Sequence, residues 1–69
     1  MNLIAAIRKG HGLTQAELAV KLEISPGHVG DIERGARKPS LKLAAKMERV
    51  LETSGIVAAV IADKMSDAA

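Results

Sequence analysis

Apolar side chains recur every three or four residues along most of the chain, in short blocks separated by glycine, serine, threonine and proline. This spacing places them on one face of a helix, whereas a half-buried strand would alternate apolar and polar residues. We therefore predict an all-α fold with five helices, at residues 2–9, 15–22, 26–34, 41–52 and about 54–65. The predicted core residues of the first four helices are Leu3, Ile4, Ile7, Leu18, Ala19, Leu22, Val29, Ile32, Leu43, Met47, Val50 and Leu51.

The second predicted helix begins at a capping box. Thr14 is followed three residues later by Glu17, so the Thr14 hydroxyl can accept from the Glu17 amide while the Glu17 carboxylate accepts from the Thr14 amide. Leu13 and Leu18 stand at the two positions of a hydrophobic staple, which sets the direction in which the chain enters the helix. Thr14 is therefore the predicted N-cap.

A second start of the same kind opens the third predicted helix. Ser25 is its predicted N-cap, and Pro26 takes the first helical position, where a backbone N–H is not needed. Ile24 and Val29 supply the staple, and Gly35 is predicted to end the helix in a left-handed conformation. Two short helices joined by a tight turn form a helix-turn-helix, whose second helix can enter the DNA major groove.

The composition favours one small domain without cofactors. The 69 residues include no cysteine, and His11 and His28 lie in different elements, so neither disulfides nor zinc-finger spacing are expected. The apolar run at residues 55–62 is far shorter than the roughly 20 residues that cross a bilayer, and the N-terminus lacks a signal-peptide pattern. We expect a single cytoplasmic domain over residues 1–69 with its core at 2–52, and no metal, small-molecule ligand or membrane partner.

Positive charge is concentrated in one segment, although the net charge is only +2. Between residues 34 and 49 a single acid, Glu48, is outnumbered by six basic residues, which are Arg34, Arg37, Lys38, Lys42, Lys46 and Arg49. Such a cluster is either a solvated face or a phosphate-binding surface, and its place beside a helix-turn-helix favours the second. The chain has no Phe, Tyr or Trp, which disfavours recognition of single strands by base stacking and leaves duplex DNA.

The chain resembles the phage Cro/repressor and Xre class of helix-turn-helix DNA-binding domains, which have the lambda-repressor-like fold. The resemblance rests on R-K-G-H-G-L-T-Q-A-E-L-A from Arg8 to Ala19 and I-S-P-G-H-V-G-D-I-E-R-G-A-R-K-P-S-L from Ile24 to Leu41. It implies a five-helix bundle with a recognition helix after the turn, usually dimeric on a palindromic operator. It also implies that Arg8 and Glu33 pair between the first and third helices.

The resemblance also implies two groups of DNA contacts. Gln15 matches a residue that commonly contacts a phosphate, in agreement with the unpaired amides at a helix start. The predicted phosphate-binding residues are Thr14, Gln15, Arg34, Arg37 and Lys38. The predicted base-reading residues are Ser25, Pro26, Gly27, His28 and Asp31, of which His28 can donate to a purine N7 and Asp31 can accept from cytosine N4. The alternatives are an ordinary first-turn Gln15, a solvated His28, and an Asp31 that balances Arg34 or Lys38.

The sequence departs from better-known relatives at two places. Pro26 and Gly27 stand where long amide side chains often reach base edges, so fewer groups can read the sequence. Gly27 and Gly30 are both predicted to face outward, at a cost of about 1 kcal/mol each relative to alanine, either to let the helix approach DNA closely or because the helix is marginal. Glu23 stands at the turn where relatives often have glycine, which either strains the left-handed position or changes the turn.

The fourth predicted helix has Ser40 as its cap.

The last predicted helix carries the β-branched residues Ile56, Val57, Val60 and Ile61, followed by Met65. These residues either complete the core or form a two-fold interface, for which we select Val57, Val60 and Ile61.

The resulting expectation is a Cro-like repressor that binds DNA as a homodimer. A protein-binding helix-turn-helix module, such as an antitoxin, is the alternative. An enzyme is the weakest reading, because the chain lacks cysteine and its histidines lack an evident carboxylate partner.

Overall fold

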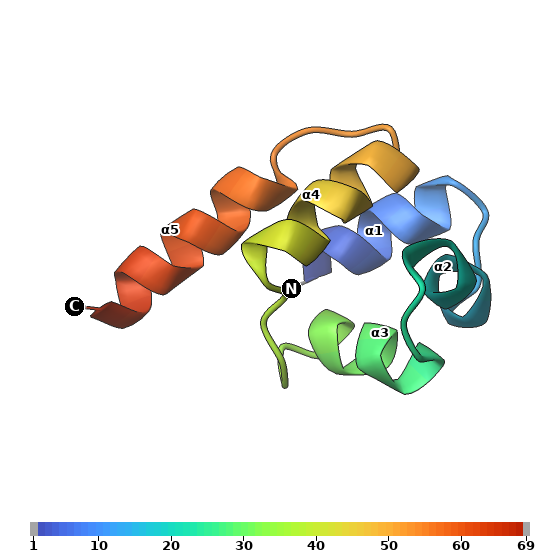
Figure 1. Ribbon diagram of the computed structural model, residues 1–69, viewed down its shortest axis with the longest axis horizontal. Helices are drawn as coiled ribbons and strands as arrows, with labels where there is room; N and C mark the ends of the chain where they lie inside the picture. The colour runs from blue at the N-terminus through green and yellow to red at the C-terminus, as the bar shows by residue number, and fades with distance from the viewer. Residues whose placement is uncertain (1, 69) are drawn as a thin grey trace. The chain divides into compact units, whose positions relative to one another are not determined.

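The computed structural model describes the backbone of residues 2–68 and the side chains of residues 3–65. Over that range it contains helices and no strands (Figure 1), which confirms the predicted all-α fold. The helices are α1 (Asn2–Gly10), α2 (Gln15–Leu22), α3 (Pro26–Glu33), α4 (Leu41–Val50) and α5 (Ile56–Ala68). The chain divides into two compact units, residues 1–38 with α1 to α3 and residues 39–69 with α4 and α5.

Three of the helices begin at the predicted caps. The Thr14 hydroxyl accepts from the Glu17 amide at 3.0 Å, and Glu17 Oε1 accepts from the Thr14 amide at 2.9 Å, which completes the capping box. Ser25 Oγ accepts from the His28 amide at 3.1 Å, and Ser40 Oγ accepts from the Leu43 amide at the same distance. Each cap satisfies an amide that the first turn leaves without a partner.

Four helices end in the same motif. The residues at its left-handed position have φ values of 70° in Gly12, 61° in Glu23, 79° in Gly35 and 50° in Glu52. At each end, the left-handed residue and the one after it donate backwards to carbonyls three and five residues earlier, as in Glu23 to Val20 and Ile24 to Ala19. This is the Schellman arrangement, which satisfies carbonyls at the end of a helix.

These ends explain where the observed helices differ from the predicted ones. α2 matches its prediction, since Glu23 adopts the left-handed conformation and the turn keeps its usual geometry. α3 ends one residue before the prediction at Glu33, and α4 ends at Val50, because residues 51 and 52 already belong to the closing turn. The left-handed Glu52 was not predicted, because no glycine marks it.

The core of the first unit comes from all three of its helices. α2 packs against α3 and α3 against α1. The buried apolar side chains of this unit are Ile4, Leu18, Ala19, Leu22, Val29 and Ile32. These match the predictions, but Leu3 is 43% exposed and its prediction as core is wrong. Ile4 faces inward and Leu3 does not. The prediction failed at Leu3 because helical spacing alone does not determine where the centre of the buried face lies.

In the second unit α4 packs against α5. A side chain of α4 also caps the N-terminus of α5. The Gly55 carbonyl accepts the first helical bond, from the Ala59 amide at 3.0 Å, but Gly55 has no side chain with which to cap the helix. Instead, Glu48 Oε2 of α4 accepts from the Val57 amide at 2.9 Å. The sequence alone could not show that a carboxylate from the preceding helix reaches this cap position.

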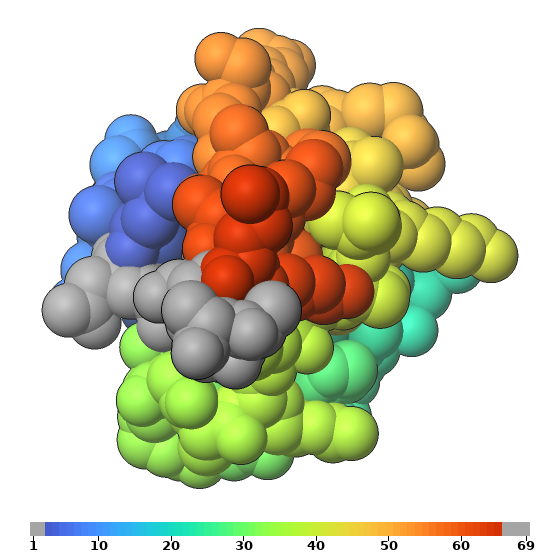
Figure 2. Space-filling view, turned by 90° about the vertical axis from the view of Figure 1, so that its left-hand side faces the viewer, coloured from blue at the N-terminus to red at the C-terminus, as the bar shows by residue number. Residues whose placement is uncertain are grey.

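The outward side of α5 carries only part of the predicted dimer interface. Val60 is 1% exposed, so the prediction of an interface role for Val60 is wrong, because its side chain is already buried within the single chain. Val57 is half-buried, while Ile61 and Met65 are exposed at 43% and 69%. Figure 2 views the chain from the side on which α5, orange to red, reaches the surface.

We predict that Glu52→Gly stabilises the protein. A non-glycine residue at a left-handed position costs about 1 kcal/mol or more, and glycine removes this cost. Glycine also raises the entropy of the unfolded chain, so that only part of the cost is recovered as stability. The free energy of unfolding, measured by urea denaturation, should rise by about 0.5–1 kcal/mol. Glu52→Ala is the control, because it removes the carboxylate but keeps the Cβ. An equal gain in both variants would contradict the strain at this position.

Candidate nucleic-acid interface

The first turn of α3 is exposed and fixed at its start. Ser25, Pro26 and Gly27 are exposed, and His28 is half-buried. Ser25 Oγ is occupied as an acceptor by the His28 amide, but its hydroxyl hydrogen can still be donated. Pro26 and Gly27 offer no side-chain hydrogen bond. Donors and acceptors for base edges are therefore few on this turn, as the sequence predicted.

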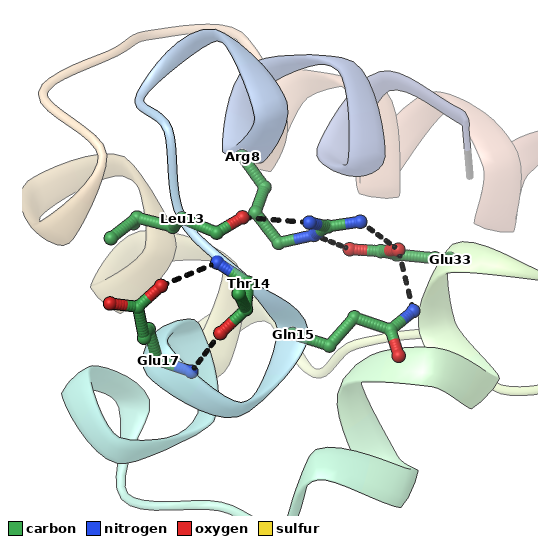
Figure 3. Close-up of polar contacts among 6 residues, drawn as sticks. All are labelled: Arg8, Leu13, Thr14, Gln15, Glu17 and Glu33. Carbon is green, nitrogen blue, oxygen red and sulfur yellow. Dashed lines mark hydrogen bonds and ion pairs between the residues drawn. The ribbon is translucent and has the colours of Figure 1, made fainter.

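Glu33, near the end of α3, is the centre of a buried polar network (Figure 3). Its carboxylate accepts from Arg8 Nε at 2.6 Å and from Arg8 Nη2 at 3.0 Å, a side-on bidentate pair between α1 and α3. The two side chains are only 10% and 7% exposed. Arg8 Nη1 also donates to the Leu13 carbonyl at 2.8 Å, which ties the segment before α2 to the same group. The pairing of Arg8 with Glu33 that the resemblance implied is present.

Gln15 joins this network from the start of α2. Its Nε2 donates to Glu33 Oε1 at 3.0 Å. The side-chain amide has two N–H groups and a carbonyl oxygen, so the bond to Glu33 leaves donor capacity for a phosphate. Gln15 is exposed overall. The structure thus gives Gln15 a structural bond that the sequence did not predict, in addition to its predicted place at the surface.

Gly30 does not face outward, and that prediction is wrong. It is buried, and a Cβ atom at this position would lie 3.2 Å from Arg34 Nη1 and 3.7 Å from Gln15 Oε1. The space beside Gly30 is therefore filled by side chains of the protein itself and is closed to a base pair. Gly27 is different, because it is exposed and the nearest atom to a Cβ there would be Ser25 Oγ at 4.0 Å. Only Gly27 leaves room for close approach of DNA.

Asp31 forms an ion pair with Arg34, between Oδ1 and Nη2. The Arg34 side chain is 67% exposed, so the pair contributes about 0–1 kcal/mol to stability. The pair matters more for the surface charge, because Asp31 partly neutralises Arg34, the cation at the end of α3. This contact favours the alternative in which Asp31 balances Arg34 over direct reading of cytosine.

The basic segment after α3 has a defined backbone path. The amides of Ala36 and Arg37 both donate to the Asp31 carbonyl, at 2.9 and 3.2 Å. Arg34, Arg37 and Lys38 are exposed along this path. Their cationic groups therefore stand at the surface beside the end of α3, as phosphate contacts require.

Hydrogen bonds lower the pKa of two glutamates. The Arg8 guanidinium is the main cause of the lowered pKa of Glu33, with a further contribution from the Gln15 amide, and together they outweigh burial, which acts in the opposite direction. The same hydrogen bond raises the pKa of Arg8. In the capping box, the backbone amide of Thr14 lowers the pKa of Glu17. All three groups are thus charged at neutral pH.

No group of histidine and acidic side chains in residues 3–65 is arranged to hold a metal ion. None of the described helices combines the length and apolar character that a bilayer span requires.

The fold and this site define a helix-turn-helix domain. The family model of the helix-turn-helix domain, of the Cro/C1 type, matches residues 4–56, which is most of the chain. The chain belongs to this family. A protein of Yarrowia lipolytica, provisionally named multi-protein-binding factor 1, is 51% identical over 49 residues. These cover 67% of this chain but only 32% of that protein, so the chain spans about a third of its relative's length. No solved structure matches the chain.

We predict that Glu33 makes stability depend on pH below its ordinary pKa of 4.5. Because the folded pKa lies below the unfolded one, its contribution is complete above 4.5 and is lost as the pH falls through the folded pKa. Glu33→Gln should lower the free energy of unfolding at pH 7 by about 2 kcal/mol, because hydrogen bonds to a charged group are lost.

The measurement is urea denaturation between pH 2 and 7. Glu33→Gln should show a smaller loss of stability on acidification than the wild type, with the remainder due in part to Glu17. Glu17→Gln is the matched control at an exposed carboxylate. An identical pH dependence in the wild type and Glu33→Gln would contradict the role of Glu33.

Proposed function

We propose that this chain binds duplex DNA in a sequence-dependent way as part of a transcriptional regulator. The observation that carries the proposal is the presentation of α3: its first turn is exposed, while Glu33 near its other end is bonded to both α1 and α2. A helix presented in this way can enter the major groove without losing its position on the domain. Membership of the Cro/C1-type helix-turn-helix family supports the proposal. In this proposal the chain works in the compartment that contains the DNA, which is the cytoplasm or a nucleus.

In this proposal most of the affinity comes from phosphates. Gln15, Arg34, Arg37 and Lys38 are the main phosphate contacts, to which the Thr14 hydroxyl adds a donor. These contacts position α3 but do not read sequence. Reading is left to Ser25 and His28 and to close approach at Gly27, because Asp31 is paired with Arg34.

Selection of binding sites from random duplexes tests this function. We expect enrichment of one short sequence, and an affinity whose logarithm falls with the logarithm of salt concentration by about 0.9 per neutralised phosphate. Arg37→Ala should make this slope shallower by about 0.9 and keep the preferred sequence, whereas His28→Ala should change the preference and keep the slope. A wild-type chain that enriches no sequence, or whose binding does not respond to salt, would contradict the proposal.

We further propose that the regulator is a homodimeric repressor on a palindromic operator. The exposed side of α5, with Val57 and Ile61 at a spacing of one helical turn, supports a two-fold contact. Met65, 69% exposed one turn further on, extends this apolar stripe. A dimer that occupies a promoter would repress by excluding polymerase, without a cofactor or a catalytic step.

Sedimentation equilibrium at micromolar concentration tests the dimer. The wild type should show a dimer, and Ile61→Glu should shift it to monomer because a charge would be buried at the interface. Ala62→Glu is the control, since Ala62 is also exposed on α5 but lies about 100° away around the helix. A monomeric wild type that binds a palindrome no more tightly than a half-site would contradict this proposal.

A protein-binding module is the second candidate function. The observation that favours it is the name of the Yarrowia lipolytica relative, which describes a factor that binds several proteins. The limited set of base-reading groups on α3 is compatible with it. Tight binding of the purified chain alone to a selected duplex favours the first function. Failure to bind any duplex, together with a defined protein partner that competes for the exposed turn of α3, favours the second.

A further inference from the structure

The most exposed part of α3 is apolar. Pro26 and Gly27 are exposed, whereas every other residue of α3 is buried or half-buried. Neither of the two has a side chain that donates or accepts a hydrogen bond. The exposed surface of the helix therefore consists mainly of a pyrrolidine ring and the bare backbone of Gly27.

Gly27 leaves this surface open to close contact. A Cβ atom at position 27 would have Ser25 Oγ at 4.0 Å, which is an ordinary van der Waals distance. Apart from the two chain neighbours of Gly27, no other side chain comes within 4 Å of that position. A small apolar group of a ligand can therefore rest against the Gly27 Cα atom, with the ring of Pro26 beside it.

We propose that this turn reads the C5-methyl group of a pyrimidine, in thymine and in 5-methylcytosine alike, so that DNA binding responds to cytosine methylation. The inference rests on the proposed DNA binding and names the chemical group that the first turn of α3 recognises. Among the four standard bases, the thymine C5-methyl is the apolar group presented in the major groove, and methylation places the same group on cytosine. Pro26 and Gly27 match it, since they offer apolar contact and no side-chain hydrogen bond.

Ser25, at the edge of the same turn, does not separate the two methylated bases. Its Oγ accepts from the His28 amide at 3.1 Å, which leaves the hydroxyl hydrogen and one lone pair for DNA. The hydroxyl can donate to O4 of thymine or accept from the N4 amino group of cytosine. A base pair that faces this turn is thus selected by its methyl group, whichever of the two pyrimidines carries it.

The expected effect is that of one methyl group moved from water into an apolar contact. Burial of a group of this size changes affinity about fourfold. Replacement of a thymine by deoxyuracil removes the methyl group and keeps every hydrogen-bonding group of the base pair. Methylation of a cytosine adds the group with the same restriction. Both comparisons keep the paired purine, so they isolate the methyl contact.

The experiment uses the duplex obtained by selection from random sequences and the full chain. Each thymine of the site is replaced in turn by deoxyuracil, and affinity is measured by fluorescence anisotropy. We expect a loss of about fourfold at one thymine of each half-site. At that position, a C·G pair should bind weakly, and 5-methylcytosine in its place should recover about fourfold in affinity.

Pro26→Ser assigns the contact to this turn. Serine removes the ring and adds a hydroxyl at the first helical position, while Ser25 still caps the helix. This variant should lose both methyl effects. Arg37→Ala is the control, because a phosphate contact carries no sequence information. It should weaken binding to all four duplexes alike and keep both methyl effects.

The outcomes separate this inference from the proposed function. If the wild type binds its selected site but neither deoxyuracil nor 5-methylcytosine changes the affinity at any position, the methyl reading is wrong and DNA binding stands. Methyl effects that persist in Pro26→Ser would also overturn it, because the contact would then lie elsewhere. The two base substitutions test the wild-type chain, so they decide the matter even if Pro26→Ser fails to fold. If the wild type binds no duplex, the function itself is wrong and the inference falls with it.

Discussion

The carboxylate of Glu33 is the group on which the arrangement of the first three helices depends. It lies on α3, accepts two hydrogen bonds from Arg8 of α1 and a third from Gln15 of α2, and is almost fully buried. Removing a partner from a buried charge is costly, so the three helices are coupled through this one residue. Because Arg8 also donates to the Leu13 carbonyl, the segment leading into α2 belongs to the same network. The position of α3 is thereby fixed by these hydrogen bonds in addition to apolar packing.

The surface that results carries positive charge beside α3 and little on it. Asp31 offsets Arg34, and the exposed first turn contains a proline and a glycine. In the proposed complex with DNA, affinity would depend mainly on phosphates, which are sequence-independent, and specificity would depend on few groups and on how closely the backbone approaches the base pairs. The two glycines of α3 serve separate purposes in this arrangement. Gly27 leaves space for a partner, while the space beside Gly30 is used by the protein's own side chains.

Helix termination follows one rule throughout the first four helices. Each closes through a left-handed residue with the same pair of backward hydrogen bonds, and glycine fills the position in α1 and α3 but glutamate fills it in α2 and α4. The backbone is strained at these two glutamates. Favourable packing of the residue that follows each of them must offset the cost of this strain. The sharp turn between α2 and α3, on which the direction of α3 depends, is one of these strained sites.

Caps, staples and helical spacing are local, so residues close in sequence determined the number of helices, three of their starts and most of the core. At Glu23 they left two possibilities open, between which the structure decided in favour of the left-handed conformation. The identity of Glu33 as the partner of Arg8 followed from the family resemblance. Contacts between distant residues were decided by tertiary structure alone. They include the bond of Gln15 to Glu33, the capping of α5 by Glu48, the burial of Val60 and the inward orientation of Gly30. Helical periodicity gives the direction of a side chain only relative to its own helix, and which neighbour fills that direction depends on how the helices pack.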